Sequence, residues 1–221
     1  RRRTRRREGI AMTNEWFERY PALESCRPAM ESAAEILCES FRNGGQLLIC
    51  GNGGSCADSG HIAGELLKGF RLNRPIPQQD RDELVRRFGA DGAHLADALQ
   101  GALPAISLPD QTAVLTAFAN DVLPEAGFAQ LTYGYGRPGD VLLGISTSGN
   151  SANVVDAARV AAVRGMKVIA LVGARPCKMD ELADAAIHVP ETDTAHVQEL
   201  HLPVYHALCA WCEQVFFGEA K

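Results

Sequence analysis

Two short segments of the chain combine glycines with small polar side chains, and each follows an apolar run. Residues 51–55 read Gly-Asn-Gly-Gly-Ser, and residues 146–151 read Ser-Thr-Ser-Gly-Asn-Ser. Glycine lets the main chain approach an anion, and the first turn of a helix presents unpaired N–H groups with a favourable dipole. A polar helix cap would explain one such segment equally well, but two of them favour a phosphate monoester site. Neither segment matches a dinucleotide or P-loop fingerprint, so we do not expect a nucleotide.

A second group of residues has the spacing of a catalytic or metal-binding face. His61 and Glu65 are four residues apart, which places both on one face of a helix. Gln198 and His206 are eight residues apart, about 2.2 helical turns, so they also share nearly one face, whereas His201 points away. Each histidine alone would be interpreted as a surface or structural residue. Together the four side chains can supply a general acid/base pair or bind a divalent metal such as zinc, for which glutamine is a weak ligand.

Five apolar runs are expected to form the sheet that positions these residues: 46–50, 105–108, 141–145, 167–172 and 185–189. Uniformly apolar strands are typical of a parallel sheet that is covered on both faces. Helical stretches separate most of the runs: about 55–68, 111–119, 151–164 and 194–217. This alternation predicts an α/β fold with a five-stranded parallel sheet flanked by helices. In such a fold, ligands bind at the carboxyl ends of the strands, where both glycine segments emerge.

One domain over residues 13–221 accommodates this pattern. Residues 13–44 show helical periodicity interrupted by two prolines, and they predict an N-terminal helical extension. Residues 72–100 are polar and charged, and they predict an insertion with a helix at about 80–100. The seven cysteines are an odd number spread through helical and strand patterns, which indicates reduced thiols and a cytoplasmic location.

The charge distribution excludes several kinds of partner. The net charge is −5, and the first eight residues contribute +5 through six Arg and one Glu, so the remainder carries −10. An acidic body argues against direct nucleic-acid binding. The apolar runs are far shorter than the roughly 20 residues needed to cross a bilayer, so no membrane association is expected. We expect residues 1–12 to be a disordered Arg-rich tail that has no role and is not a secretory signal.

Four segments together resemble the bacterial phosphoheptose isomerases, which belong to the sugar isomerase (SIS) domain superfamily. These are residues 50–55, His61-x-x-x-Glu65, residues 143–153 and residues 198–201. The resemblance implies an SIS-type, flavodoxin-like three-layer sandwich. It also implies an enzyme that isomerises sedoheptulose 7-phosphate to D-glycero-D-manno-heptose 7-phosphate through an enediol. A homotetramer and one zinc ion per site are further implications.

The resemblance also assigns roles to residues of this chain. The sugar phosphate would be bound by Asn52, Gly53, Gly54, Ser55, Asn120, Asp121, Ser146, Thr147, Ser148, Ser151 and Gln198. Zinc would be bound by His61, Glu65, Gln198 and His206. We expect Glu65 to act as the base on carbon and His206 as the acid on the opposite side. The chain departs from the better-known members in its longer 72–100 segment and in Ala195, which stands where they have Asp.

Three other functions remain open from the sequence. The chain can be a non-catalytic phosphosugar-binding regulator, like the SIS protein that is a partner of the bacterial replication initiator. It can isomerise a different sugar phosphate, or use its apolar helices for assembly alone. The presence of both Glu65 and His206 favours catalysis, and the two anion-ready segments argue against a purely structural role.

Overall fold

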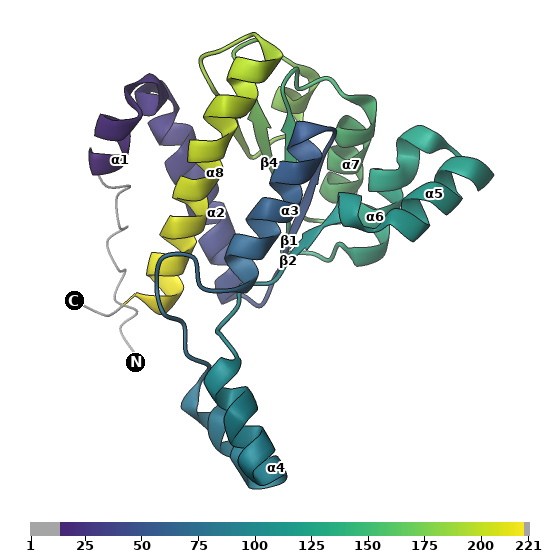
Figure 1. The fold of residues 1–221 in the computed structure, drawn as a ribbon. Coiled ribbons are helices and arrows are strands. Elements are labelled where there is room, and N and C mark those ends of the chain that lie inside the picture. The colour runs from purple at the N-terminus through teal and green to yellow at the C-terminus, as the bar shows by residue number, and fades with distance from the viewer. Residues whose placement is uncertain (1–13, 219–221) are drawn as a thin grey trace, which may run out of the picture.

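The computed structural model describes residues 14–218, and its centre is a five-stranded parallel sheet (Figure 1). The strands are β1 (Leu47–Gly51), β2 (Ala105–Ser107), β3 (Val141–Ser146), β4 (Lys167–Val172) and β5 (Ala185–His188). They lie in the order β2-β1-β3-β4-β5, and every neighbouring pair is parallel. This is the flavodoxin-like order. The predicted fold class is therefore confirmed, and all five apolar runs form strands.

The strand order places both glycine segments at the carboxyl ends of two neighbouring strands. β1 is hydrogen-bonded to β2 on one side and to β3 on the other, so the chain changes direction across the sheet at this point. Leu47 pairs with Val141, and Gly51 pairs with Ile145 near the carboxyl ends of the two strands. Ligands of open α/β sheets bind at such a switch point. The segments that follow β1 and β3 therefore lie side by side at the expected position.

Two layers of helices cover the two faces of the sheet (Figure 1). One layer holds α1 (Asn14–Arg19), α2 (Arg27–Arg42), α3 (Gly54–Leu67) and α8 (Thr194–Phe217). The other holds α6 (Gly127–Tyr135) and α7 (Ala152–Val163), with α5 (Thr112–Asp121) packed beside α6. Successive strand side chains point to opposite faces, so Leu47 and Ile49 join the first core and Leu48 and Cys50 join the second. Burial on both faces explains why the strands are uniformly apolar.

The N-terminal helices break where the prolines stand. A short 3₁₀ helix, η1 (Pro21–Cys26), begins with proline, and Pro28 lies in the first turn of α2. Proline is tolerated there because the first N–H groups of a helix have no partner within it. Gly44 follows the end of α2 with φ of 78°, a left-handed conformation that favours glycine. The predicted interrupted helical extension is confirmed.

The insertion forms a helical hairpin rather than one continuous helix. α4 (Gln78–Ala98) has non-helical dihedrals at Gly89, with φ of 55° and ψ of −124°. The two halves pack so closely that a Cβ on Gly92 would collide with the Leu84 carbonyl. An ion pair between Arg81 and Asp97 also joins the two halves. The hairpin projects away from the sheet in Figure 1, so the insertion stays clear of the carboxyl edge.

Several smaller elements were not predicted. They include α6 and the 3₁₀ helices η2 (Leu108–Asp110), η3 (Pro124–Ala126) and η4 (Lys178–Glu181). The predicted Arg-rich tail, residues 1–12, lies outside the described residues. Over residues 14–218, the helices are too short or too polar for any of them to span a bilayer.

Candidate active site

The two glycine segments are joined by a reciprocal pair of hydrogen bonds. Asn52 Nδ2 donates to Asn153 Oδ1 at 2.9 Å, and Asn153 Nδ2 donates to Asn52 Oδ1 at 2.8 Å. Asn52 follows β1, and Asn153 lies in the first turn of α7 beyond the serine-rich segment. This amide pair therefore fixes the first segment against the start of α7. The predicted phosphate-binding residues of both segments thus lie together at the carboxyl ends of β1 and β3.

The first segment leads directly into α3 without a side-chain cap. Gly53 precedes the helix with φ of 57° and ψ of −118°, and Gly54 is its first residue. Ser55 is buried, and its N–H donates to the Asn52 carbonyl at 3.0 Å. A Cβ on Gly54 would lie 2.8 Å from Nε2 of Gln198. Gln198 of α8 therefore packs over the amino end of α3, next to the expected phosphate position.

The second segment is held in shape by its own hydroxyl groups. The Oγ atoms of Ser146 and Ser151 are 3.0 Å apart, and the Gly149 N–H donates to Ser146 Oγ at 3.1 Å. Gly149 has φ of 63°, which favours glycine. Ser148 is exposed and its Oγ accepts from the Asn150 N–H at 3.2 Å, while Thr147 is half-buried. The amino end of α7 follows at once and adds the favourable dipole expected for an anion site.

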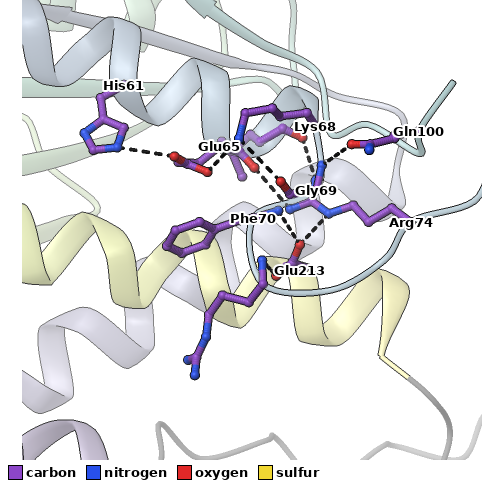
Figure 2. A network of polar contacts seen from close by, with 10 residues as sticks. His61, Glu65, Lys68, Gly69, Phe70, Arg74, Gln100 and Glu213 are labelled. Carbon is purple, nitrogen blue, oxygen red and sulfur yellow. Dashed lines mark hydrogen bonds and ion pairs between the residues drawn. The ribbon is translucent and has the colours of Figure 1, made fainter. Parts of the chain in front are cut away.

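Three residues predicted to act in catalysis or metal binding lie together where α3 packs beside α8: His61, Glu65 and His206. His61 Nε2 lies 3.3 Å from Glu65 Oε1 (Figure 2). The rings of His61 and His206 meet edge to face, with centroids 5.0 Å apart. Burial lowers the pKa of His206, and His61 lowers it further against an opposing effect of Glu65. A neutral His206 beside a carboxylate can accept or donate a proton near neutral pH.

Two residues that support His61 were not found by sequence reasoning. The Tyr205 hydroxyl donates to Asp58 Oδ1 at 3.1 Å and lies 3.0 Å from His61 Nδ1. Because this hydroxyl donates to Asp58, Nδ1 of His61 must be the donor to the hydroxyl, and Nε2 of a neutral His61 keeps its lone pair. Burial raises the pKa of Tyr205 and also that of Asp58. The signal was weak: Asp58 lies three residues before His61, and Tyr205 directly precedes His206.

A buried ion pair anchors the carboxyl end of α3 to α8 (Figure 2). Arg74 Nε lies 2.7 Å from Glu213 Oε1, and the two side chains are 0% and 1% exposed. Arg74 also donates to the Leu66 carbonyl at 2.9 Å and to the Glu65 carbonyl at 3.1 Å. Carbonyls in the last turn of a helix have no partner within it, so Arg74 supplies the missing donors. The backbone of the predicted base, Glu65, is thereby fixed to a helix that carries His206.

Glu213 also holds the turn that follows α3. Its two oxygens accept from the N–H groups of Phe70 and Arg71, both at 2.8 Å. Although burial opposes ionisation, these backbone hydrogen bonds and the one from Arg74 keep the pKa of Glu213 below its ordinary value. The Phe70 ring lies 5.3 Å from the His206 ring, so this turn closes one side of the histidine.

Of the predicted metal ligands, His61, Glu65 and His206 lie near one another, whereas Gln198 lies apart from them. Gln198 contacts Gly54 at the amino end of α3. On α8, Gln198 is eight residues before His206, a separation of about 12 Å along a helix. Within residues 14–218, the one group of three or more His, Cys, Asp or Glu side chains with ligand atoms within 4.8 Å is Cys177, Asp180 and His188. That group contains none of the predicted ligands. The zinc assignment to His61, Glu65, Gln198 and His206 stays a prediction.

The predicted pair Asn120 and Asp121 lies at the end of α5. Both side chains are exposed, and Asn120 Nδ2 donates to Asp121 Oδ1 at 2.8 Å. In Figure 1, α5 is at the periphery, beside α6 rather than beside α3. The structure does not bring this pair into the contacts that join the two glycine segments, and its role in substrate binding stays a prediction.

Comparisons with known proteins agree with this architecture. The SIS domain family matches residues 18–80 and 82–173. A phosphoheptose isomerase of Rhodospirillum rubrum is 39% identical over 191 residues, which are 86% of this chain and 88% of the relative. That of Chlorobaculum parvum is 41% identical over 185 residues, 82% of this chain and 76% of the relative.

Solved structures give the same assignment. The phosphoheptose isomerase of Neisseria gonorrhoeae is 33% identical with a TM-score of 0.71, over 91% of this chain and 94% of that one. The enzyme of Francisella tularensis is 29% identical with a TM-score of 0.72, over 91% and 96%. With sequence and fold in agreement, the chain belongs to the SIS domain family, among the phosphoheptose isomerases.

Proposed function

We propose that this protein is a sugar-phosphate isomerase that converts sedoheptulose 7-phosphate to D-glycero-D-manno-heptose 7-phosphate. The observation that carries the proposal is that α3 contributes to both the phosphate site and the catalytic residues. Its amino end follows the first glycine segment, and its middle turns carry His61 and Glu65 beside His206. Gly54 and His61 are seven residues apart, about 10 Å along a helix, which is of the order of the length of an extended seven-carbon sugar phosphate.

The phosphate is bound at the amino ends of α3 and α7. Backbone N–H groups and hydroxyls of both glycine segments provide neutral donors, and the two helix dipoles favour the negative charge. The donors come from Asn52, Gly53, Gly54, Ser55, Ser146, Thr147, Ser148 and Ser151, with the Gln198 amide beside them. The reciprocal bonds between Asn52 and Asn153 keep the two amino ends in a fixed relation. A fixed phosphate orients the reacting carbons toward the middle of α3.

Glu65 and His206 carry out the proton transfers. Glu65 removes the proton from C1 of the ketose, which forms the enediol, and returns it to C2 of the aldose. His206 moves the hydroxyl proton between the two oxygens, since burial keeps its pKa low and the ring neutral. The side chain of Glu65 is 14% exposed, so solvent can still exchange the proton that it carries. Each group contributes roughly 10²–10⁴-fold when it is well placed.

The donor types on α3 and α8 suit a zinc ion, although their ligand atoms do not form a compact cluster in the described part of this chain. Within residues 14–218 the buried Nε2 atom of His206 has no hydrogen-bond partner, and Nε2 of neutral His61 faces a Glu65 oxygen. Two imidazoles, a carboxylate and the Gln198 amide are a chemically suitable donor set. A bound zinc would polarise the sugar oxygens as a Lewis acid. Glu65 would then be a weaker base, so His61, Gln198 and His206 would be expected to take the larger share of the binding.

We infer a cytoplasmic homotetramer as the working form. The resemblance to the family supports the tetramer, and so do large apolar side chains on and after α5 that are exposed in the single chain, such as Val122 at 65%. All seven cysteines are free, which suits a reducing compartment. Size-exclusion chromatography with light scattering measures the assembly directly.

Turnover of a panel of phosphosugars tests the proposed function against its alternatives. The purified protein is incubated with sedoheptulose 7-phosphate, a hexulose phosphate and an aminosugar phosphate, with and without zinc. Conversion of the heptulose phosphate alone is expected. Conversion of another sugar phosphate would change the substrate, whereas saturable binding without conversion would favour a phosphosugar-binding regulator.

A further inference from the structure

A second group of chemically reactive side chains lies where the segment after β4 packs against β5. Cys177 Sγ lies 3.3 Å from Asp180 Oδ1, and the same oxygen lies 2.8 Å from Nε2 of His188. The ligand atoms of all three residues are within 4.8 Å of one another. The side chains of Asp180 and His188 are about one-third exposed, so an ion from solvent can reach them. The group shares no residue with the site on α3 and α8.

The orientation of His188 is fixed by the main chain. Its Nδ1 atom lies 2.8 Å from the carbonyl oxygen of Gly173, so Nδ1 carries the proton and donates it. A neutral ring then directs the Nε2 lone pair toward Asp180 Oδ1. Two acceptors at 2.8 Å repel each other unless a proton or a cation lies between them. A histidine whose Nδ1 is held by a carbonyl is the usual arrangement of a metal ligand.

We propose that Cys177, Asp180 and His188 bind a divalent transition metal such as zinc at a second site, separate from the active site. Thiolate, carboxylate and imidazole are the three ligand types that zinc prefers. Tetrahedral zinc would require about 3.6 Å between the sulfur and the oxygen and about 3.4 Å between the nitrogen and the oxygen. The present separations of 3.3 and 2.8 Å are shorter by about 0.3 and 0.6 Å, a difference that rotation of the exposed Asp180 side chain can supply. On binding, Cys177 releases its thiol proton to solvent, and His188 releases any proton on Nε2.

The segment that carries Cys177 and Asp180 packs against the serine-rich segment. Cys177 Sγ fills the space that a Cβ on Gly149 would take. The Lys178 N–H donates to Asn150 Oδ1 at 3.0 Å, and the Met179 N–H donates to the Gly149 carbonyl at 3.3 Å. A metal would tie this supporting segment to His188 at the end of β5. The role of the ion is therefore structural, since it holds the phosphate-binding segment in shape.

A hydrogen-bonded cap is the competing explanation for the same geometry. The Cys177 N–H donates to Asp180 Oδ2 at 2.9 Å, and the two residues form a reciprocal cap at the start of η4. This cap explains the contact between Cys177 and Asp180. The cap does not involve His188 of β5, whose Nε2 lies 2.8 Å from Asp180 Oδ1; a protonated His188 would form an ion pair with Asp180 there without any metal. A cap without metal affinity is one outcome of the experiment.

Cobalt(II) binding to the full-length protein separates the two explanations. Cobalt replaces zinc in tetrahedral sites, and a thiolate ligand gives a sulfur-to-cobalt charge-transfer band in the near ultraviolet. The active-site set of His61, Glu65, Gln198 and His206 contains no sulfur and gives no such band. We expect a band that saturates at one cobalt per chain and disappears when zinc is added. It should persist in His206→Ala.

Matched variants locate the thiolate. Cys177→Ser should abolish the band, whereas the half-buried control Cys56→Ser should retain it. His188→Gln and Asp180→Asn keep the thiol and should weaken cobalt binding roughly tenfold or more. If Cys177→Ser does not fold, these two variants decide the matter. The absence of any charge-transfer band in the wild type, a band unchanged in Cys177→Ser, or unaltered affinity in both ligand variants would overturn the proposal.

Discussion

The buried ion pair between Arg74 and Glu213 yields a quantitative prediction. In Glu213→Ala, the Arg74 guanidinium keeps its two carbonyl partners but loses its counter-charge in a position that is 0% exposed. Removing one partner of a buried ion pair costs about 3–5 kcal/mol, a large part of the roughly 5–15 kcal/mol by which a domain is stable. We expect the urea midpoint to fall accordingly, with an unchanged m value.

An exposed pair with the same separation serves as the control. Arg159 Nη1 lies 2.7 Å from Asp156 Oδ1, the distance found for Arg74 and Glu213, but these side chains are 61% and 38% exposed. Asp156→Ala should cost about 0–1 kcal/mol because water screens the pair. Equal losses in Glu213→Ala and Asp156→Ala would refute the argument from burial.

The double variant Arg74→Met/Glu213→Leu tests whether the pair is needed for stability or for placement of the site. Replacing both charges with apolar side chains should restore much of the stability lost in Glu213→Ala, since no charge is left buried alone. The N–H groups of Phe70 and Arg71 and the carbonyl of Glu65 still lose their partners. We therefore expect reduced kcat in a folded protein. Full activity in the double variant would show that the pair does not position Glu65.

Three further predictions concern single side chains. Burial lowers the pKa of His201 to about 4, below its ordinary 6.5, so the unfolded chain binds more protons than the folded one between these pH values. The free energy of unfolding should therefore fall by up to about 3 kcal/mol as the pH drops from 6.5 to 4. Urea titrations of His201→Leu should show a flatter pH profile in that window. Tyr205→Phe removes the acceptor for His61 Nδ1 and should lower kcat roughly tenfold with little change in KM, whereas an equal rise in KM would point to substrate binding instead. Gly54→Ala places a Cβ 2.8 Å from the flexible Gln198 amide, so the protein should fold but bind inorganic phosphate more weakly by calorimetry; unchanged phosphate affinity would contradict the placement of that anion.

The strands were predictable because their environment leaves a local signature. A strand covered on both faces is apolar at every position, and Asn43-Gly44-Gly45 before β1 and Gly51 at its end punctuate the run. α6 was missed because it is short and contains glycine at its start and near its end, which weakens the helical pattern. The helical period of α4 continues across Gly89, so the pattern predicts one helix and does not reveal the turn.

The proximity of the catalytic residues was predictable only where they lie on the same helix. His61 and Glu65 are neighbours through helix geometry alone, and a single spacing rule finds them. The contact of Tyr205 with His61 depends on how distant elements pack, and that of His188 with Asp180 depends on the turn between η4 and β5. Such pairings have no periodic signature in one sequence. The Arg74–Glu213 pair belongs to the same class, since 139 residues separate its members.

Following the conversion of sedoheptulose 7-phosphate by NMR in deuterated water tests the central claim most directly. We predict that the wild type forms the aldose with deuterium at C2, because the proton held by Glu65 exchanges with solvent before it returns to carbon. Glu65→Gln should lose both conversion and exchange at carbon, while saturable binding of the substrate persists. Near-full turnover in Glu65→Gln would contradict the assignment of Glu65 as the base, and binding without any conversion by the wild type would contradict the isomerase function itself.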